Sequence, residues 1–305
     1  DRPTAPELVL ASPAHDEITL LPLDRASMER LVRAILVNVH DLPESLLEDV
    51  IERSAGNPGL VEDNIRLLIQ RGIIIRHEHA WTVNPSRLGK SVALPESRAA
   101  ATLARVESLT PRIREVMEYA CIFGPTFWSG GITALARCQT TGTEGWTVPW
   151  VSDQTKGEVQ AGLDEAVNLE LIMRHEKTTI EGESEFSFAS RDVRNALYDG
   201  LNSDRRSLYH RMAAQWLGRL DFSEGRHWFE VVANHLELGG RPERAAEAYL
   251  EAGRVMLQVS DWGRAMDFFQ RALALVDLSR ADVLIPVLEG LGDSSYASGD
   301  FAASR

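Results

Sequence analysis

The stretch EFSFASRDVRNALYDGL, residues 185–201, changes its hydrophobic period half-way along. Phe186 and Phe188 alternate with smaller residues, a pattern typical of a short strand. Val193 and Leu197 then recur at a four-residue spacing, which is typical of a helix. The sequence therefore predicts a strand that leads directly into a helix. We call residues 185–201 the joint, because short strands and helices precede it and only helices are predicted after it.

Length and charge limit the function classes. A chain of 305 residues is too long for one ordinary core and suits two or three domains. The formal charge of −13 argues against a general nucleic-acid binder, which needs excess Lys and Arg to neutralise phosphates. Cys121 and Cys138 are too few for a disulfide framework and lack metal-site spacing, so we expect a cytoplasmic protein. No apolar run approaches the ~18 residues of a membrane span, and no membrane partner is expected.

The N-terminal 83 residues show three helical patterns and a hairpin. Short apolar runs at 8–10 and 18–21 suit two strands, or one strand and its approach, and the hairpin is expected over 73–76 and 80–83. The first helix begins after Asp24, a good N-cap, and the second begins near Pro43. Gly56-Asn57-Pro58 ends the second helix, because Gly suits a helix C-terminus and the residue before Pro avoids the α region. The third helix is expected over 60–71.

Three segments of this part carry a family resemblance: LLPLDRASMERLV (20–32), IERSAGNPGLVEDNIRLLIQRGIIIR (51–76) and HAWTV (79–83). Their order resembles the helical lid that follows the ATPase core in bacterial STAND proteins, the signal-transducing relatives of AAA+ ATPases. The resemblance implies that Gly56 and Pro58 lie against the adenine of a bound nucleotide, and that Arg2 matches a polar sensor position. The other interpretation, in which this Gly-x-Pro only terminates a helix, stays open.

A phosphate-binding loop is missing from this sequence. Such a loop needs Gly-x4-Gly-Lys-Ser/Thr, whereas residues 84–91, NPSRLGKS, lack the first Gly and carry Pro85 where an N–H donor would help. We therefore expect the ATPase core upstream of Asp1, in a longer protein. This part alone is expected not to be an enzyme and to hold no cofactor. By resemblance, ATP or ADP with Mg²⁺ would bind to the full-length protein.

After a linker at 84–97, the pattern indicates a winged-helix domain over 98–201. It comprises helices at 98–106, 111–120, 132–136 and 157–169, and strands at 171–174 and 185–188. We interpret residues 139–154, with Trp146 and Trp150, as a surface insertion. Winged helices often bind DNA, but helix 157–169 carries Glu158, Asp164 and Glu165 and neither Lys nor Arg. Phosphates would repel it, so we expect a structural role and no direct DNA binding.

The joint itself resembles a second stretch of the STAND family, Phe-x-Phe-x-His-x-x-x-Arg-x-Ala-x-Tyr. The matching residues are Phe186, Phe188, Arg194, Ala196 and Tyr198. In related switch ATPases the His of this stretch is thought to sense the bound diphosphate, and Ser190 stands in its place here. A hydroxyl can form a hydrogen bond but cannot carry charge.

Residues 203–305 look purely helical and repetitive. We expect Ser203 to cap the first of these helices, and helix starts near 203, 242 and 281 give a period of about 39, which indicates a helical-repeat solenoid. The segment AYLEAGRVMLQVSDWGRAMDFFQRALAL (248–275) resembles a tetratricopeptide repeat. The matching residues are Gly253, Ala265, Phe269 and Ala272. These are packing residues, so the pattern predicts the fold and a protein-binding surface rather than a particular ligand.

Two histidine patterns could suggest metal sites. His77, Glu78 and His79 lie at the predicted hairpin tip without a third or fourth ligand, and a solvated turn explains them better. His227 and His235 lie two turns apart on one predicted helix, where packing or surface roles are the simpler interpretation.

The predicted fold is mainly α: a helical lid at 1–83, a winged helix at 98–201 with small β-hairpins, and tetratricopeptide-like repeats at 203–305. By resemblance, its function is to relay the nucleotide state of an upstream ATPase core to a protein partner or effector domain through the repeats. One alternative is a protein-binding scaffold without a working nucleotide site, and another is a transcription regulator.

Overall fold

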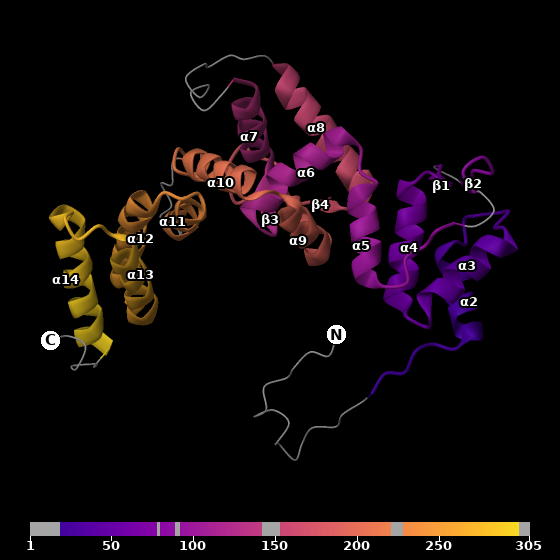
Figure 1. Cartoon of the computed structure of the whole chain (residues 1–305), viewed down its shortest axis with the longest axis horizontal. Coiled ribbons are helices and arrows are strands. Elements are labelled where there is room, and N and C mark those ends of the chain that lie inside the picture. The colour runs from indigo at the N-terminus through magenta and orange to yellow at the C-terminus, as the bar shows by residue number, and fades with distance from the viewer. Residues whose placement is uncertain (1–18, 78–79, 89–91, 142–152, 221–227, 299–305) are drawn as a thin grey trace. The chain divides into compact units, whose positions relative to one another are not determined.

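The computed structural model describes residues 19–77, 80–88, 92–141, 153–220 and 228–298 (Figure 1). These residues form a mainly α structure with two small antiparallel sheets, one of two strands and one of three, which confirms the predicted fold class. The chain divides into two compact units, residues 1–101 and 102–305. We describe each unit by itself.

Unit 1 is a bundle of three helices with a hairpin. Its described elements are α2 (Arg25–Ile35), α3 (Glu44–Ser54), α4 (Pro58–Gln70), β1 (Ile74–Arg76) and β2 (Trp81–Val83). The Asp24 carboxylate caps α2 by accepting a hydrogen bond from the Ser27 N–H at 2.7 Å, as the sequence predicts. The apolar faces of the three helices close over one core with the hairpin.

A tight turn joins α3 to α4. Ala55 and Gly56 both adopt positive φ, at 47° and 80°. A Cβ on Gly56 would lie 2.6 Å from the Cβ of Pro22, so this position must be glycine. The Gly56 carbonyl also accepts a hydrogen bond from the Leu23 N–H at 2.9 Å, which fixes the approach to α2.

Of the two interpretations of the run at 18–21, a strand is wrong for the residues that the structure describes. Residues 19–24 form no regular secondary structure, and Leu20 and Leu21 are exposed. An isolated extended segment has no neighbouring strand to satisfy its backbone groups, so an apolar run alone does not make a strand. The other predicted strand, residues 8–10, lies outside the described residues.

Unit 2 begins with a winged helix. Helix α5 (Arg98–Glu107) spans the division between the units, and the winged helix comprises α6 (Pro111–Phe123), β3 (Thr126–Trp128), α7 (Ser129–Thr141), α8 (Asp153–Asn168), β4 (Ile172–Arg174), β5 (Glu185–Phe188) and α9 (Arg191–Gly200). The sheet order is β3-β5-β4, all antiparallel. The predicted change from strand to helix at the joint is confirmed, because β5 leads into α9.

Strand β3 was missed by the sequence analysis. Its three residues are too few to show alternation, yet the Phe127 ring packs 5.8 Å from Phe186 and 5.4 Å from Phe188. These contacts place β3 beside β5 and bury all three rings. The sheet is therefore held by the aromatic residues of the joint.

The C-terminal helices are α10 (Ser203–Leu217), α11 (Trp228–Leu238), α12 (Pro242–Gln258), α13 (Trp262–Leu275) and α14 (Ala281–Ser298). Each packs against the next in chain order, as in a helical-repeat solenoid. The N-cap of α10 is Asn202 rather than the predicted Ser203, since the Asn202 side chain accepts from the Arg205 N–H at 2.8 Å. The Asp261 side chain caps α13 in the same way.

One aromatic ring fills the space between three of these helices. Phe269 on α13 is fully buried, and a Cβ added at Gly253 on α12 or at Gly290 on α14 would overlap its ring. Ala265 and Ala272, also on α13, are fully buried too. The packing roles predicted for Gly253, Ala265, Phe269 and Ala272 match these positions.

Candidate functional site

The predicted adenine-contacting residues occupy the turn between α3 and α4. Gly56 is buried beneath Pro22 and Leu23, whereas Pro58 is exposed in the first turn of α4. The Asn57 side chain between them caps α4 by accepting from the Leu60 N–H at 3.2 Å. This geometry explains the Gly-Asn-Pro sequence by helix termination, and the adenine contact stays a prediction. Arg2 lies outside the described residues.

Ser190, the predicted diphosphate-sensing position, is the N-cap residue of α9 in unit 2. Its side chain makes no capping hydrogen bond to the first turn of α9, and the residue is half-buried. The structure therefore brings Gly56 and Pro58 together in one turn and places Ser190 in the other unit. The hydroxyl of Ser190 is not committed to stabilising the helix that follows it.

A buried polar network, absent from our predicted site residues, connects the joint to the repeats. The Tyr198 hydroxyl on α9 lies 2.9 Å from Nε2 of His210 on α10, and Nδ1 of His210 lies 2.8 Å from Nδ1 of His235 on α11. Both histidines are buried. We call Tyr198, His210 and His235 the joint network, because it joins the last helix of the winged helix to the first two helices of the repeats.

Burial keeps both imidazoles neutral. It lowers the pKa of His210, and the nearby Arg206 and Arg194 guanidinium groups lower it further. The pKa of His235 is lowered by burial and by His210. Neutral imidazole has one donor and one acceptor nitrogen. The hydrogen bonds can therefore be donated from Tyr198 to His210 and from His210 to His235, or both in the opposite direction.

Two arginines hold the Tyr198 ring in place. The guanidinium carbons of Arg206 and Arg194 lie 4.6 Å and 5.7 Å from its centroid. Arg194 Nε also donates to the Cys121 carbonyl of α6 at 3.2 Å, and Arg206 Nη2 donates to the Leu201 carbonyl at 2.9 Å. Two of the residues that match the family stretch, Arg194 and Tyr198, therefore lie next to each other at the start of the network.

Helix α10 is also anchored directly to the winged helix. The Tyr209 ring lies 5.2 Å from Tyr119 of α6 in an edge-to-face arrangement. Arg205 Nη1 lies 3.1 Å from the Glu118 carboxylate on α6, and Arg205 Nε donates to the Tyr209 hydroxyl at 3.1 Å. Ring packing and an ion pair therefore join α10 to α6.

The sequence contained part of the signal for this network. His235 was noted only as one of two spaced histidines, and its pairing with His210 requires α10 and α11 to be packed. His227, the other histidine, lies outside the described residues, as do Glu78 and His79. A polar residue on the apolar face of a predicted helix, as His210 is on α10, could have indicated a buried hydrogen-bonding partner.

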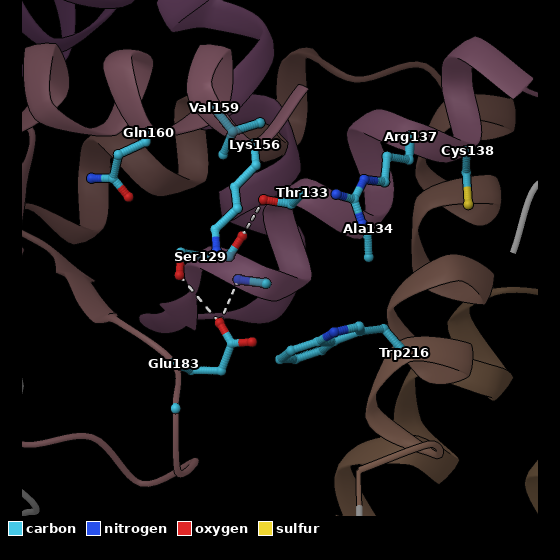
Figure 2. A pocket seen from close by; sticks show the side chains of 12 residues that line it. Ser129, Thr133, Ala134, Arg137, Cys138, Lys156, Val159, Gln160, Glu183 and Trp216 are labelled. Carbon is cyan, nitrogen blue, oxygen red and sulfur yellow. Dashed lines mark hydrogen bonds between the residues drawn. The ribbon is translucent and has the colours of Figure 1, made fainter. Parts of the chain in front are cut away.

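A polar cavity of about 360 Å³ lies beside α7 and α8 (Figure 2). At its base, the Glu183 carboxylate accepts hydrogen bonds from the Gly130 N–H at 2.6 Å and from Ser129 Oγ at 3.1 Å. The first backbone N–H groups of a helix have no acceptor within the helix, and the Glu183 carboxylate supplies one for Gly130 at the start of α7. Figure 2 shows the Lys156 side chain extending toward Ser129. Because α8 begins at Asp153, it includes Lys156, whereas the helix predicted at 157–169 carried no cation.

Neither described cysteine has the properties of a nucleophile. Burial raises the pKa of Cys138, which lines this cavity, to about 11, and it raises the pKa of Cys121 to about 12. Both thiols are therefore protonated at neutral pH, and the thiol is a poor nucleophile compared with the thiolate.

A groove of about 650 Å³ runs between α10, α11 and α12. Its apolar lining consists of Leu208, Met212, Ala214, Phe229, Val232, Leu236 and Ala248. Phe229 is 47 % exposed, which is high for a phenylalanine on a packed helix. The groove is thus an accessible apolar surface on the repeats.

Within the part of the chain that the structure describes, no group of three or more His, Cys, Asp or Glu side chains could hold a metal ion. In the same residues, no helix is both long enough and apolar enough to cross a membrane. The chain matches no family model, no curated protein and no solved structure. Its function is therefore argued from its own residues.

Proposed function

We propose that the chain relays the nucleotide state of a STAND-type ATPase core to a protein partner. In this proposal unit 1 is the lid of the core, the winged helix receives the change, and the repeats present the partner-binding surface. We place the protein in the cytoplasm, where ATP is available and where Cys121 and Cys138 stay reduced.

The observation that carries the proposal is the joint network. Tyr198, which matches the family stretch, forms a hydrogen bond to His210 of the first repeat helix, and His210 lies against His235 of the second. A switch needs an element whose two arrangements differ in their contacts. Three neutral groups with two possible directions of hydrogen bonding make a connection that responds to small displacements of α9.

Direct DNA binding is not part of the proposal. Two acidic side chains of α8 are paired within the winged helix, Asp164 with Arg174 and Glu165 with Arg112, both at 2.7 Å. These pairs neutralise two cations beside α8 and leave Lys156 as the one basic residue on the helix itself, whereas the phosphates of DNA require several free cations.

The test is amide hydrogen exchange in the natural protein that contains this sequence, loaded with ADP or with a non-hydrolysable ATP analogue. We expect the nucleotide to change the protection of α9 and α11 together. Tyr198→Phe removes the hydroxyl and should confine the change to α9. Tyr119→Phe is the matched control, since its hydroxyl donates to Glu115 within the same helix, α6. A nucleotide that alters protection in neither helix would contradict the relay.

The second candidate function is a protein-binding scaffold without nucleotide control. The groove on α10, α11 and α12 favours it, because an exposed apolar lining on a repeat surface is typical of a docking site. Partner binding that is identical with ADP and with the ATP analogue would select this candidate.

A further inference from the structure

The groove between α10, α11 and α12 is positively charged at its rim. Four arginines and two glutamates line it: Arg211, Arg219, Arg241, Arg244, Glu247 and Glu251. The chain as a whole carries a net charge of −13, so this excess of cations is local. A basic groove on an acidic protein selects its partner by charge.

Both glutamates of the groove are already paired with arginines that do not line it. Glu247 lies 2.9 Å from Arg280 Nη2, and Glu251 lies 2.6 Å from Arg254 Nη1. These pairs reduce the ability of the two acids to neutralise the groove arginines. The effective charge of the groove is therefore more positive than the count of lining residues indicates.

Arg241 and Arg244 are the most available of these cations. Both are exposed, and neither side chain forms an ion pair with any residue that the structure describes. They stand at the start of α12, where the helix dipole adds partial positive charge. Arg211, by contrast, donates to the Gly239 carbonyl at 2.9 Å and has a structural role.

An apolar strip lies beside these cations. Phe229, Val232 and Leu236 recur on one face of α11 at spacings of three and four, and all three line the groove. An amphipathic helix placed in such a groove would bury its apolar side chains on this strip while its acidic side chains meet the arginines. A nucleic-acid strand offers phosphates for the arginines and a base that could stack on Phe229, but it leaves Val232 and Leu236 without an apolar counterpart.

We infer that this groove binds an acidic, amphipathic segment of a partner protein. The segment carries large apolar side chains on one face, for the strip on α11, and Asp or Glu beside them, for Arg241 and Arg244. The inference rests on the proposed function, in which the repeats dock a partner, and it assigns the chemistry of that partner.

The test begins with selection of binders from a library of random displayed peptides of about 15 residues, a length at which a short helix becomes feasible. We expect the enriched peptides to be acidic, to carry aromatic or aliphatic residues at helical spacing, and to bind less tightly as salt is raised. Enrichment of neutral or basic peptides, or no enrichment, would overturn the inference. Displacement of the selected peptides by single-stranded oligonucleotide, with tighter binding of the oligonucleotide, would also overturn it.

Substitutions then locate the binding site. Arg241→Glu combined with Arg244→Glu should weaken the selected peptides at least about tenfold, since reversing charges that meet a partner's acids adds repulsion. Acidic side chains at the start of α12 interact favourably with the positive end of the helix dipole, so the substitutions should not unfold the helix. Phe229→Ala should weaken the same peptides without changing their salt dependence.

Arg30→Glu, compared with Arg241→Glu alone, is the charge-matched control, because Arg30 is exposed on α2 and its side chain bonds only to Ser27 among the described residues. Equal binding to the parent protein and to the groove variants would overturn the inference. The hydrogen-exchange experiment on α9 and α11 tests the relay and uses no peptide. Failure of the groove proposal can therefore be distinguished from failure of the relay.

Discussion

Nδ1 of His210 and Nδ1 of His235 lie 2.8 Å apart in a site from which water is excluded. Only one of the two nitrogens can hold the proton between them, and a second proton there would charge one buried ring and set two N–H groups against each other. Protonation of the pair is therefore incompatible with this packing, which makes the contact between α10 and α11 sensitive to acid.

This pair predicts a pH dependence of the stability of unit 2. The folded-state pKa of each imidazole lies below the unfolded value of about 6.5, so the unfolded chain binds more protons. The contribution is fully present above about pH 6.5 and is lost as the pH falls toward the folded pKa. We expect a loss of roughly 2 kcal/mol for each imidazole at pH 5, measured by urea unfolding.

The control for this pH effect is a substitution within the pair itself. His235→Leu should reduce the slope of stability against pH while lowering stability at neutral pH, because His210 loses its partner. An unchanged slope in His235→Leu would show that the pair does not titrate on unfolding.

Gly253→Ala should destabilise the repeats by about 1–3 kcal/mol. The added methyl group overlaps the Phe269 ring, and overpacking of a filled core costs energy of this size. Gly292→Ala is the matched control: it lies in α14 with no atom near its Cβ position, and alanine is the better helix former by about 1 kcal/mol. Thermal unfolding measures the stability of both variants. Equal changes in stability for Gly253→Ala and Gly292→Ala would contradict the prediction.

Glu183→Ala should loosen the start of α7. Its carboxylate accepts from the Gly130 N–H and from Ser129, so the loss should resemble that of a helix cap, about 1 kcal/mol. Glu181→Ala, an exposed neighbour on the same loop, should be close to neutral. Urea unfolding measures both, and equal effects would mean that the contact to Gly130 contributes nothing.

Ser190→His tests the relay at its nucleotide end. In the natural protein, an imidazole at this position should tighten ADP binding, because charge-assisted hydrogen bonds are about twice as strong as neutral ones. Pro58→Ala should weaken nucleotide binding through the lid. Calorimetric titration with ADP measures both variants. Unchanged affinity in both would favour the scaffold.

The sequence predicted the helices well, because apolar periodicity and caps are local. Asp24 and Asp261 cap the helices that follow them, and the switch from Phe186 and Phe188 to Val193 and Leu197 marks the change from β5 to α9. The strand β3 was missed because three residues show no period and its pairing with β5 is non-local. The interpretation of residues 18–21 as a strand was wrong for the described residues, because an apolar run does not supply a neighbouring strand.

The candidate site was harder to predict than the fold. Tyr198 was identified through a resemblance, but its contact with His210 depends on how α9 packs on α10. The pairing of His210 with His235 depends on a second helix contact, and no spacing rule connects residues 25 positions apart. The groove likewise exists only after three helices have packed together.

The Phe269 ring contacts positions on both neighbouring helices, Gly253 on α12 and Gly290 on α14. Repeat proteins are often treated as strings of interchangeable modules, each replaceable without regard to the next. Here a repeat could not be exchanged for another at this place unless the incoming sequence brought a glycine for the same ring. Substitutions at Gly253, Phe269 and Gly290 are therefore coupled in evolution. A larger residue at either glycine becomes acceptable only after Phe269 has been replaced by a smaller residue.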